Sequence, residues 1–147
     1  MKRKVLISIM LLTALLITGC TNKTEKQENT SKNKEVISSM KVTINNEEYI
    51  LNLENNETVT EFLNKLPQQL EMDELNGNEK YVYLNYSLKT NPYNPKHIAK
   101  GDVMLYTNNC LVIFYKSFDT SYSYTKIGHI DNLPDLGNNS INVKFDK

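Results

Sequence analysis

The chain has 147 residues, of which 39% are hydrophobic, and 17 basic side chains balance 17 acidic ones. This length suffices for one domain with a hydrophobic core. Removal of residues 1–19 would leave a net charge of −3. Nucleic-acid binding depends on clustered cations, and neither the full chain nor this shorter one has an excess of positive charge. No nucleic acid is therefore expected as a partner.

The first 19 residues are typical of a bacterial lipoprotein signal peptide. Lys2, Arg3 and Lys4 precede the apolar run "VLISIMLLTALLI", which is shorter than the roughly 20 residues that a transmembrane helix needs. The next residues, "LITGC", resemble the lipobox, in which cleavage makes the cysteine N-terminal and its thiol carries a diacylglycerol. Cys20 is thus the predicted lipidation site, and two or three acyl chains such as palmitate would anchor it firmly. The alternative is an ordinary signal peptide with a chance cysteine.

This signal predicts a mature protein at the extracytoplasmic face of the cell membrane. Residues 20–39 comprise the lipidated Cys20 and a polar, aperiodic segment whose composition is typical of a disordered tether. Because lipid would consume Cys20, the second cysteine, Cys110, has no partner for a disulfide bond.

The folded domain is predicted over residues 40–147, beginning with a hairpin. In "KVTINNEEYILNL", polar and apolar residues alternate on both sides of Asn45-Asn46, a pair that tolerates the positive φ of a tight turn. A short helix is expected next, in "TVTEFLNKLP", because four apolar residues share one face there. Thr58 and Glu61 form a predicted capping box, and Pro67 ends the segment.

The rest of the domain reads as short strands and turns. Strands are expected in "QQLEMDEL" and "KYVYLNYSL" around Asn76-Gly77, in "DVMLY" and "CLVIFYK" around "TNN", in "TKIGHI" and in "INVKF". Seven or eight short strands with one helix favour a mainly β fold, a small closed or nearly closed β-barrel with one short α-helix.

The order of these segments resembles the small bacterial cyclophilin-like domains. The most specific pieces are "ELNGNEKYVYL" and the run from "GDVMLY" through "CLVIFYK" to "TSYSYTKIG", and the likeness extends from about Met40 to Phe145. The resemblance implies a trimmed cyclophilin-like β-barrel. Some members of that group are secreted or lipid-anchored, and related domains are fused to flavodoxin-type modules.

Prolyl isomerase activity is the first function that this resemblance raises. Cyclophilin catalysis depends on a guanidinium that hydrogen-bonds the twisted imide, yet Arg3 is the only arginine and lies in the signal peptide. A lysine would act as a mobile point charge instead of a planar donor. We therefore lean against an enzyme, while a divergent isomerase or foldase that uses Lys126 or a tyrosine hydroxyl stays an alternative.

Cysteine and histidine chemistry has weak support in the sequence. Alternation places Cys110, Val112 and Phe114 on one face of a strand, where a free cysteine behaves as a small core residue. His97 and His129 belong to no metal-ligand pattern, so neither a metal nor another cofactor is expected. A further alternative, implied by the fusions to flavodoxin-type modules, is that the protein is an accessory to extracytoplasmic redox chemistry beside flavodoxin-like partners; a reactive Cys110 thiol would be its sign.

The tyrosines are the strongest candidates for a binding site. They fit the wall of a barrel, but a run of Ser, Thr and Tyr such as "TSYSYT" cannot all lie in a core. Our hypothesis is therefore a binding module for an extracellular peptide, a protein partner or a small ligand. The candidate ligand-binding residues are Tyr83, Tyr106, Phe118, Tyr122, Tyr124 and His129.

Overall fold

The computed structural model describes residues 37–146, and the predicted signal peptide, Cys20 and most of the tether lie outside the described residues. Its elements are β1 (Ser39–Ile44), β2 (Glu47–Leu53), α1 (Glu57–Leu63), β3 (Gln68–Leu75), β4 (Glu79–Tyr83), β5 (His97–Ile98), β6 (Asp102–Tyr106), β7 (Cys110–Phe114), β8 (Phe118–Asp119), β9 (Thr125–Ile130) and β10 (Ile141–Asp146).

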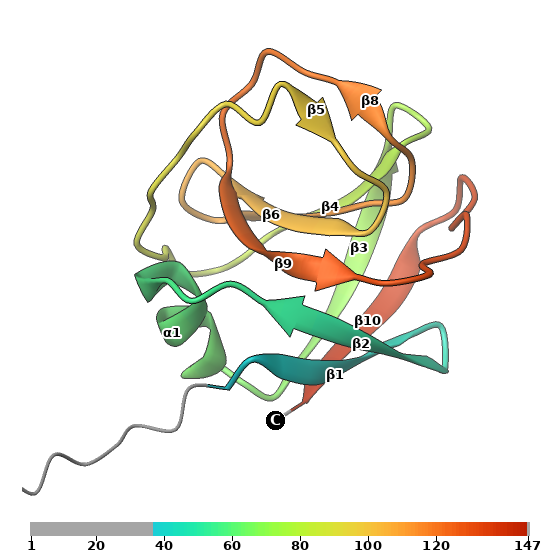
Figure 1. Ribbon diagram of the computed structural model, residues 1–147. Helices are drawn as coiled ribbons and strands as arrows, with labels where there is room; N and C mark the ends of the chain where they lie inside the picture. Colours follow the sequence, from blue (N-terminus) through green and yellow to red (C-terminus); the bar gives the residue numbers. More distant parts are fainter. Residues whose placement is uncertain (1–36, 147) are drawn as a thin grey trace, which may run out of the picture. The chain divides into compact units, whose positions relative to one another are not determined.

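Eight of the strands close into one antiparallel barrel, in the order β1-β10-β3-β4-β7-β6-β9-β2 (Figure 1). The remaining two, β5 and β8, form a separate two-stranded sheet. This arrangement confirms the mainly β fold class with one short helix. Within residues 37–146, no helix has the length and apolar content required to cross a bilayer.

The turns of two predicted hairpins show why the strands pair there. Asn45 and Asn46 both have positive φ, 47° and 74°, between β1 and β2. Asn76 and Gly77 likewise have φ of 58° and 70° between β3 and β4. Asn and Gly adopt this left-handed backbone more readily than other residues, so both turns follow directly from the sequence.

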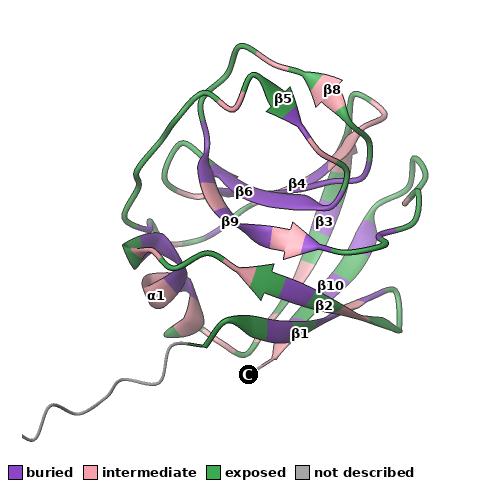
Figure 2. Cartoon of the chain, viewed as in Figure 1, coloured by how far each residue is buried: buried purple, intermediate pink, exposed green. Residues whose placement is uncertain are grey.

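Strand β7 is buried on both of its faces, and the neighbouring strand β6 is likewise buried along most of its length (Figure 2). Leu111 and Ile113 point into the core inside the barrel. Cys110, Val112 and Phe114 point outward, as alternation predicted, into a second apolar cluster. That outer cluster also contains Ile98, Met104 and Tyr124, with Phe118 packed against it. The short β5–β8 sheet therefore covers part of the outer barrel wall.

The helix α1 packs against the end of β10. Phe62 is fully buried, and its ring meets that of Phe145 edge to face, with ring centroids 5.2 Å apart. The predicted apolar face of the helix is thus confirmed.

The predicted capping box of this helix was wrong. The N-cap is Asn56, whose side-chain oxygen accepts a hydrogen bond from Val59 N at 2.8 Å. Thr58 and Glu61 contact Lys89 instead: the Thr58 hydroxyl donates to its carbonyl oxygen, and the Glu61 carboxylate accepts from its backbone N–H. Both side chains therefore tie the helix to the segment after β4.

A buried lysine binds the loop of residues 131–140, which connects β9 to β10. Lys80 has no exposed surface, and its ammonium donates hydrogen bonds to the carbonyl oxygens of Gly137 and Asn139, both at 2.7 Å. It also lies 5.0 Å from the centroid of the Tyr115 ring. Burial lowers the pKa of Lys80, although the nearby carboxylates of Glu74 and Asp135 oppose this effect. The ammonium thus replaces its lost hydration with carbonyls and a ring face.

Candidate functional site

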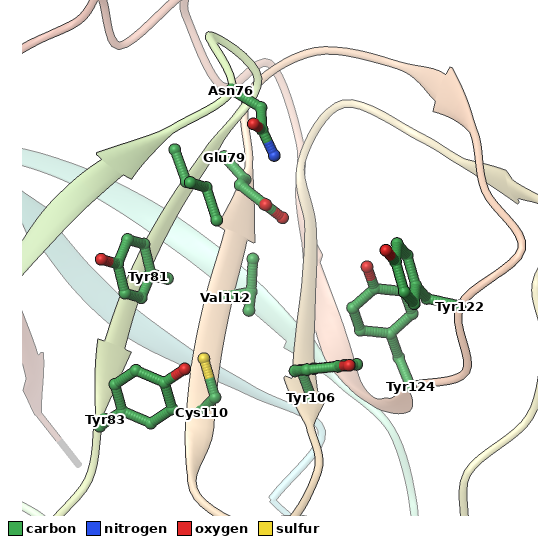
Figure 3. Close-up of a pocket in the computed structure, with 10 residues that line it drawn as sticks. Asn76, Glu79, Tyr81, Tyr83, Tyr106, Cys110, Val112, Tyr122 and Tyr124 are labelled. Carbon is green, nitrogen blue, oxygen red and sulfur yellow. The ribbon is translucent and has the colours of Figure 1, made fainter.

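A hollow of about 300 Å³ lies on the outer face of the barrel wall, beside the outer apolar cluster. We call it the tyrosine hollow (Figure 3). Its walls come from the end of β3, the β3–β4 turn, strands β4, β7 and β6, and the segment before β9. Its lining residues are Leu75, Asn76, Glu79, Tyr81, Tyr83, Tyr106, Cys110, Val112, Tyr122 and Tyr124.

Two groups of rings stand on either side of β7 (Figure 3). On β4, Tyr81 and Tyr83 point to the same face because they are two residues apart, and their ring centroids are 6.0 Å apart. Across the hollow, Tyr106 contacts the rings of Tyr122 and Tyr124, at centroid distances of 6.0 and 5.6 Å. Ring faces and edges therefore surround the space above β7.

The hollow has a buried floor and an exposed rim. Cys110, Val112 and Tyr124 at the floor are 6% exposed or less. Tyr83 and Tyr122 at the rim keep 65% and 62% of their surface exposed. The backbone around Tyr124 is held by a pair of hydrogen bonds to Tyr93, at 2.9 and 3.0 Å. The floor thus belongs to the folded core, whereas the rim rings are free to contact a ligand.

Glu79 is the only charged residue among those that line the hollow. Partial burial raises the pKa of its carboxyl, a hydrogen bond with the Asn76 side chain opposes this shift, and the charge of Glu74 adds to it. Among residues 37–146, no lysine or histidine nitrogen forms an ion pair with Glu79. The hollow therefore carries a carboxylate without a counter-ion from the described part of the chain.

Cys110 has a thiol poorly suited to nucleophilic chemistry. Burial, with a smaller contribution from the charge of Glu79, raises the pKa of Cys110 to about 11. Reactive cysteines need the opposite, a lowered pKa in a positive environment. The geometry thus agrees with a packing role for Cys110 and gives the redox hypothesis no support.

Comparison with known proteins identifies the domain at the level of its family. The profile of the cyclophilin-like family matches residues 42–146, which is most of the chain. The chain belongs to the cyclophilin-like family. No curated protein matches it, and no solved structure does. The family agrees with the resemblance found in the sequence and with the closed barrel.

The cyclophilin-like domain brings four of the six candidate residues together. Tyr83, Tyr106, Tyr122 and Tyr124 all line the tyrosine hollow. The other two, Phe118 and His129, are not among the residues that line it. The side chain of Phe118 packs on Phe114, with ring centroids 5.6 Å apart, in the outer cluster.

The candidate residues did not include the other six that line the hollow, namely Leu75, Asn76, Glu79, Tyr81, Cys110 and Val112. Glu79 and Tyr81 precede Tyr83 at alternate positions of β4, so all three share the outer face. That alternation was the signal available in the sequence. Cys110 was placed on the correct face, but its proximity to Tyr83 and Tyr106 depends on how the strands pair.

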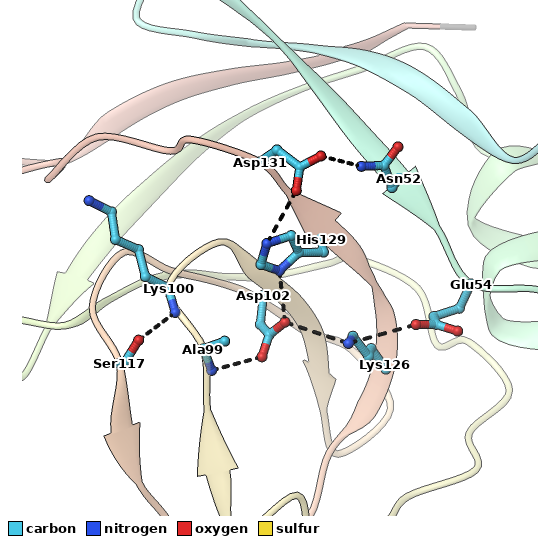
Figure 4. A network of polar contacts seen from close by, with 9 residues as sticks. All are labelled: Asn52, Glu54, Ala99, Lys100, Asp102, Ser117, Lys126, His129 and Asp131. Carbon is cyan, nitrogen blue, oxygen red and sulfur yellow. Dashed lines mark hydrogen bonds and ion pairs between the residues drawn. The ribbon is translucent and has the colours of Figure 1, made fainter.

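His129 belongs to a separate polar network on β6 and β9 (Figure 4). Its Nδ1 lies 3.0 Å from the carboxylate of Asp102, a residue whose side chain is only 7% exposed. Its Nε2 lies 3.6 Å from the carboxylate of Asp131. Asp102 also accepts a hydrogen bond from Ala99 N at 2.9 Å. This network joins the β6–β9 pair to the loop before β6, and both ring nitrogens of His129 have a carboxylate neighbour.

Lys126 lies in the same network (Figure 4). Its ammonium is 3.6 Å from the carboxylate of Asp102 and 3.7 Å from that of Glu54. The lysine considered as a substitute for the missing guanidinium is therefore paired with two carboxylates and does not line the tyrosine hollow. Within the described range 37–146, no three His, Cys, Asp or Glu side chains gather as a metal site would require.

Proposed function

We propose that the protein is a membrane-anchored extracytoplasmic lipoprotein whose cyclophilin-like domain binds a ligand in the tyrosine hollow. The observation that carries this proposal is the concave space of about 300 Å³ with five tyrosines around it. Ligand pockets of this size combine aromatic walls with a few polar groups, and tyrosine supplies contact area at low conformational cost. The ligand is a peptide, a segment of a partner protein or a small molecule.

The membrane anchor rests on the sequence "LITGC" before the tether. The tether expected from the sequence, about 19 residues after Cys20, would give the domain a reach of roughly 20–25 Å from the membrane. Cells fed an alkyne analogue of palmitate should incorporate it into the protein. Cys20→Ala should abolish that label and release the protein from the membrane fraction, whereas Cys110→Ala should leave both unchanged. A labelled Cys20→Ala variant would contradict the anchor.

Ligand binding can be tested by screening the purified full chain against peptides and small molecules. The doubly substituted variant Tyr83→Ala, Tyr122→Ala should lose its ligands and keep its melting temperature, because both rings are largely exposed. Tyr93→Ala removes another exposed tyrosine that does not line the hollow, so it serves as the matched control. Ligands that bind the double variant as tightly as the parent would refute the proposed site.

Prolyl isomerisation is the activity that a binding module should lack. Residues 37–146 contain no arginine, and Lys126 is engaged by Glu54 and Asp102. We expect the full chain to leave the isomerisation rate of a standard Xaa-Pro peptide unchanged. Acceleration comparable to that of an ordinary cyclophilin, lost in the Tyr83→Ala, Tyr122→Ala variant, would establish the isomerase alternative instead.

A further inference from the structure

Resting on the proposed function, we infer that the tyrosine hollow selects a ligand with a primary alkylammonium group, for which Glu79 provides the counter-ion. A lysine side chain on a peptide and a small free amine share this chemistry. The inference depends on three features of the hollow: its rings, its single charge and its hydrogen-bond acceptors.

The rings form the kind of surface that attracts cations. Aromatic faces carry negative charge density and hold ammonium groups in partly desolvated sites. Tyr81 and Tyr83 stand at about 82° to each other, and Tyr106 stands at about 81° to Tyr122. These edge-to-face pairs leave ring faces directed at more than one side of the hollow (Figure 3).

The charge in the hollow is negative. Burial is the larger cause of the raised pKa of two floor groups, the Cys110 thiol and the Tyr124 hydroxyl, and the negative charge of Glu79 raises both further. Glu74, behind the β3–β4 turn, adds a second negative charge that acts on Glu79. Of residues 37–146, no lysine or histidine lines the hollow. An anionic ligand would be repelled, and a neutral one would leave a partly buried carboxylate without a counter-ion, which is costly.

The acceptors favour a primary ammonium over a fully substituted one. An ammonium group has three N–H donors. The Glu79 carboxylate and the tyrosine hydroxyls accept hydrogen bonds from such donors, and charge-assisted hydrogen bonds are the stronger kind. The apolar stem of a lysine would meanwhile pack against Val112 and Leu75, which also line the hollow.

The test is a titration with matched probes, read at the tyrosine rings. The purified full chain is labelled with carbon-13 in its tyrosines and titrated with N-acetyl-lysine methylamide, N-acetyl-norleucine methylamide and n-butylammonium chloride at physiological salt. The five hollow tyrosines should shift with the lysine probe. The tyrosines elsewhere, namely Tyr49, Tyr86, Tyr93 and Tyr115, provide the internal control.

We expect the lysine probe to bind at least about tenfold more tightly than the norleucine probe, which lacks only the amino group. Equal affinities would overturn the inference and leave ligand binding in the hollow intact. Shifts with none of the three probes would also overturn it, while the peptide and small-molecule screen would still decide the proposed function. Butylammonium that binds as well as the lysine probe would identify a small amine as sufficient. Weaker binding by butylammonium would favour a peptide; both outcomes support the inference.

Two charge-matched variants complete the experiment. Glu79→Gln keeps the shape of the side chain. It should lower the affinity for the lysine probe about tenfold and leave the affinity for the norleucine probe unchanged. Glu71→Gln removes the same charge from an exposed position of β3 outside the hollow, and it should bind like the parent. Unchanged lysine binding by a folded Glu79→Gln variant would overturn the role of Glu79.

Discussion

The carboxylate of Glu79 and the thiol of Cys110 face the same hollow, and the charge of the first makes ionisation of the second harder. Burial is the larger cause, and together they raise the pKa of Cys110 from 9.0 to about 11. A shift of this size reduces the thiolate fraction at neutral pH about a hundredfold. The thiol that attracts attention in the sequence is thus kept in its unreactive form.

Alkylation should reveal this suppression. In a Cys20→Ala background, iodoacetamide at pH 8 should label native Cys110 at least about a hundredfold more slowly than the unfolded chain, because both the thiolate fraction and access are reduced. Glu79→Gln should lower the pKa of Cys110, since it removes a negative charge, and the pH profile of labelling should move to lower pH. A native rate equal to the unfolded rate would contradict the buried thiol.

Lys80→Met should loosen the loop of residues 131–140. The substitution leaves the carbonyls of Gly137 and Asn139 without the donor that now serves both, and we expect a loss of about 1–3 kcal/mol in the free energy of unfolding. Hydrogen exchange should accelerate in the loop. Lys144→Met, at an exposed position of β10, is the control and should cost no more than about 1 kcal/mol. Equal unfolding energies for the two variants would show that the buried ammonium contributes nothing.

Asn56→Ala should destabilise the domain through the start of α1. It removes the cap on Val59 N and the hydrogen bond that the Asn56 amide donates to the carbonyl of Lys126, both 2.8 Å long. The expected loss is about 1–2 kcal/mol in the free energy of unfolding, measured by urea denaturation. Asn55→Ala changes the exposed neighbour and should have little effect. If Asn55→Ala proved as costly, the cap would not be at Asn56.

Gly128→Ala should interfere with closure of the barrel. Gly128 lies opposite Leu53 where β9 pairs with β2, and an added Cβ would stand 2.2 Å from the carbonyl oxygen of Asn52. Because that oxygen belongs to the backbone and cannot turn aside as a side chain could, we expect a loss of about 1–3 kcal/mol or more in the free energy of unfolding. Gly77→Ala adds the same group in open space at a φ of +70°, so it measures turn strain alone and should cost less, about 1 kcal/mol. Thermal denaturation compares the two.

The barrel could be predicted from the sequence because its signals are local. Alternation and Asn-rich turns mark the hairpins, and both act over a few residues. The helix cap was misplaced because Asn56 and Thr58 carry equally plausible side chains, and only the distant Lys89 decides which one caps the helix. Strands β5 and β8, at two residues each, are too short to show any period.

The site was harder to predict because it depends on which segments the closed barrel places side by side. Tyr122 and Tyr124 were recognised by composition, but their contact with Tyr106 depends on how the segment before β9 crosses the outer wall. Phe118 is also aromatic, yet its ring packs on Phe114 in the outer apolar cluster and does not line the hollow. Glu79 was overlooked because an acid at a strand end reads as ordinary surface.

The division of the tyrosine hollow into a buried floor and an exposed rim has a consequence for divergence within the family. Under the proposed function, substitutions at Tyr83 and Tyr122 would change what the domain recognises at little cost to folding, since both rings are largely exposed. Substitutions at Cys110 or Val112 disturb β7 and the packing on both of its sides. Relatives should therefore vary in ligand preference through their rim residues while they inherit the same floor.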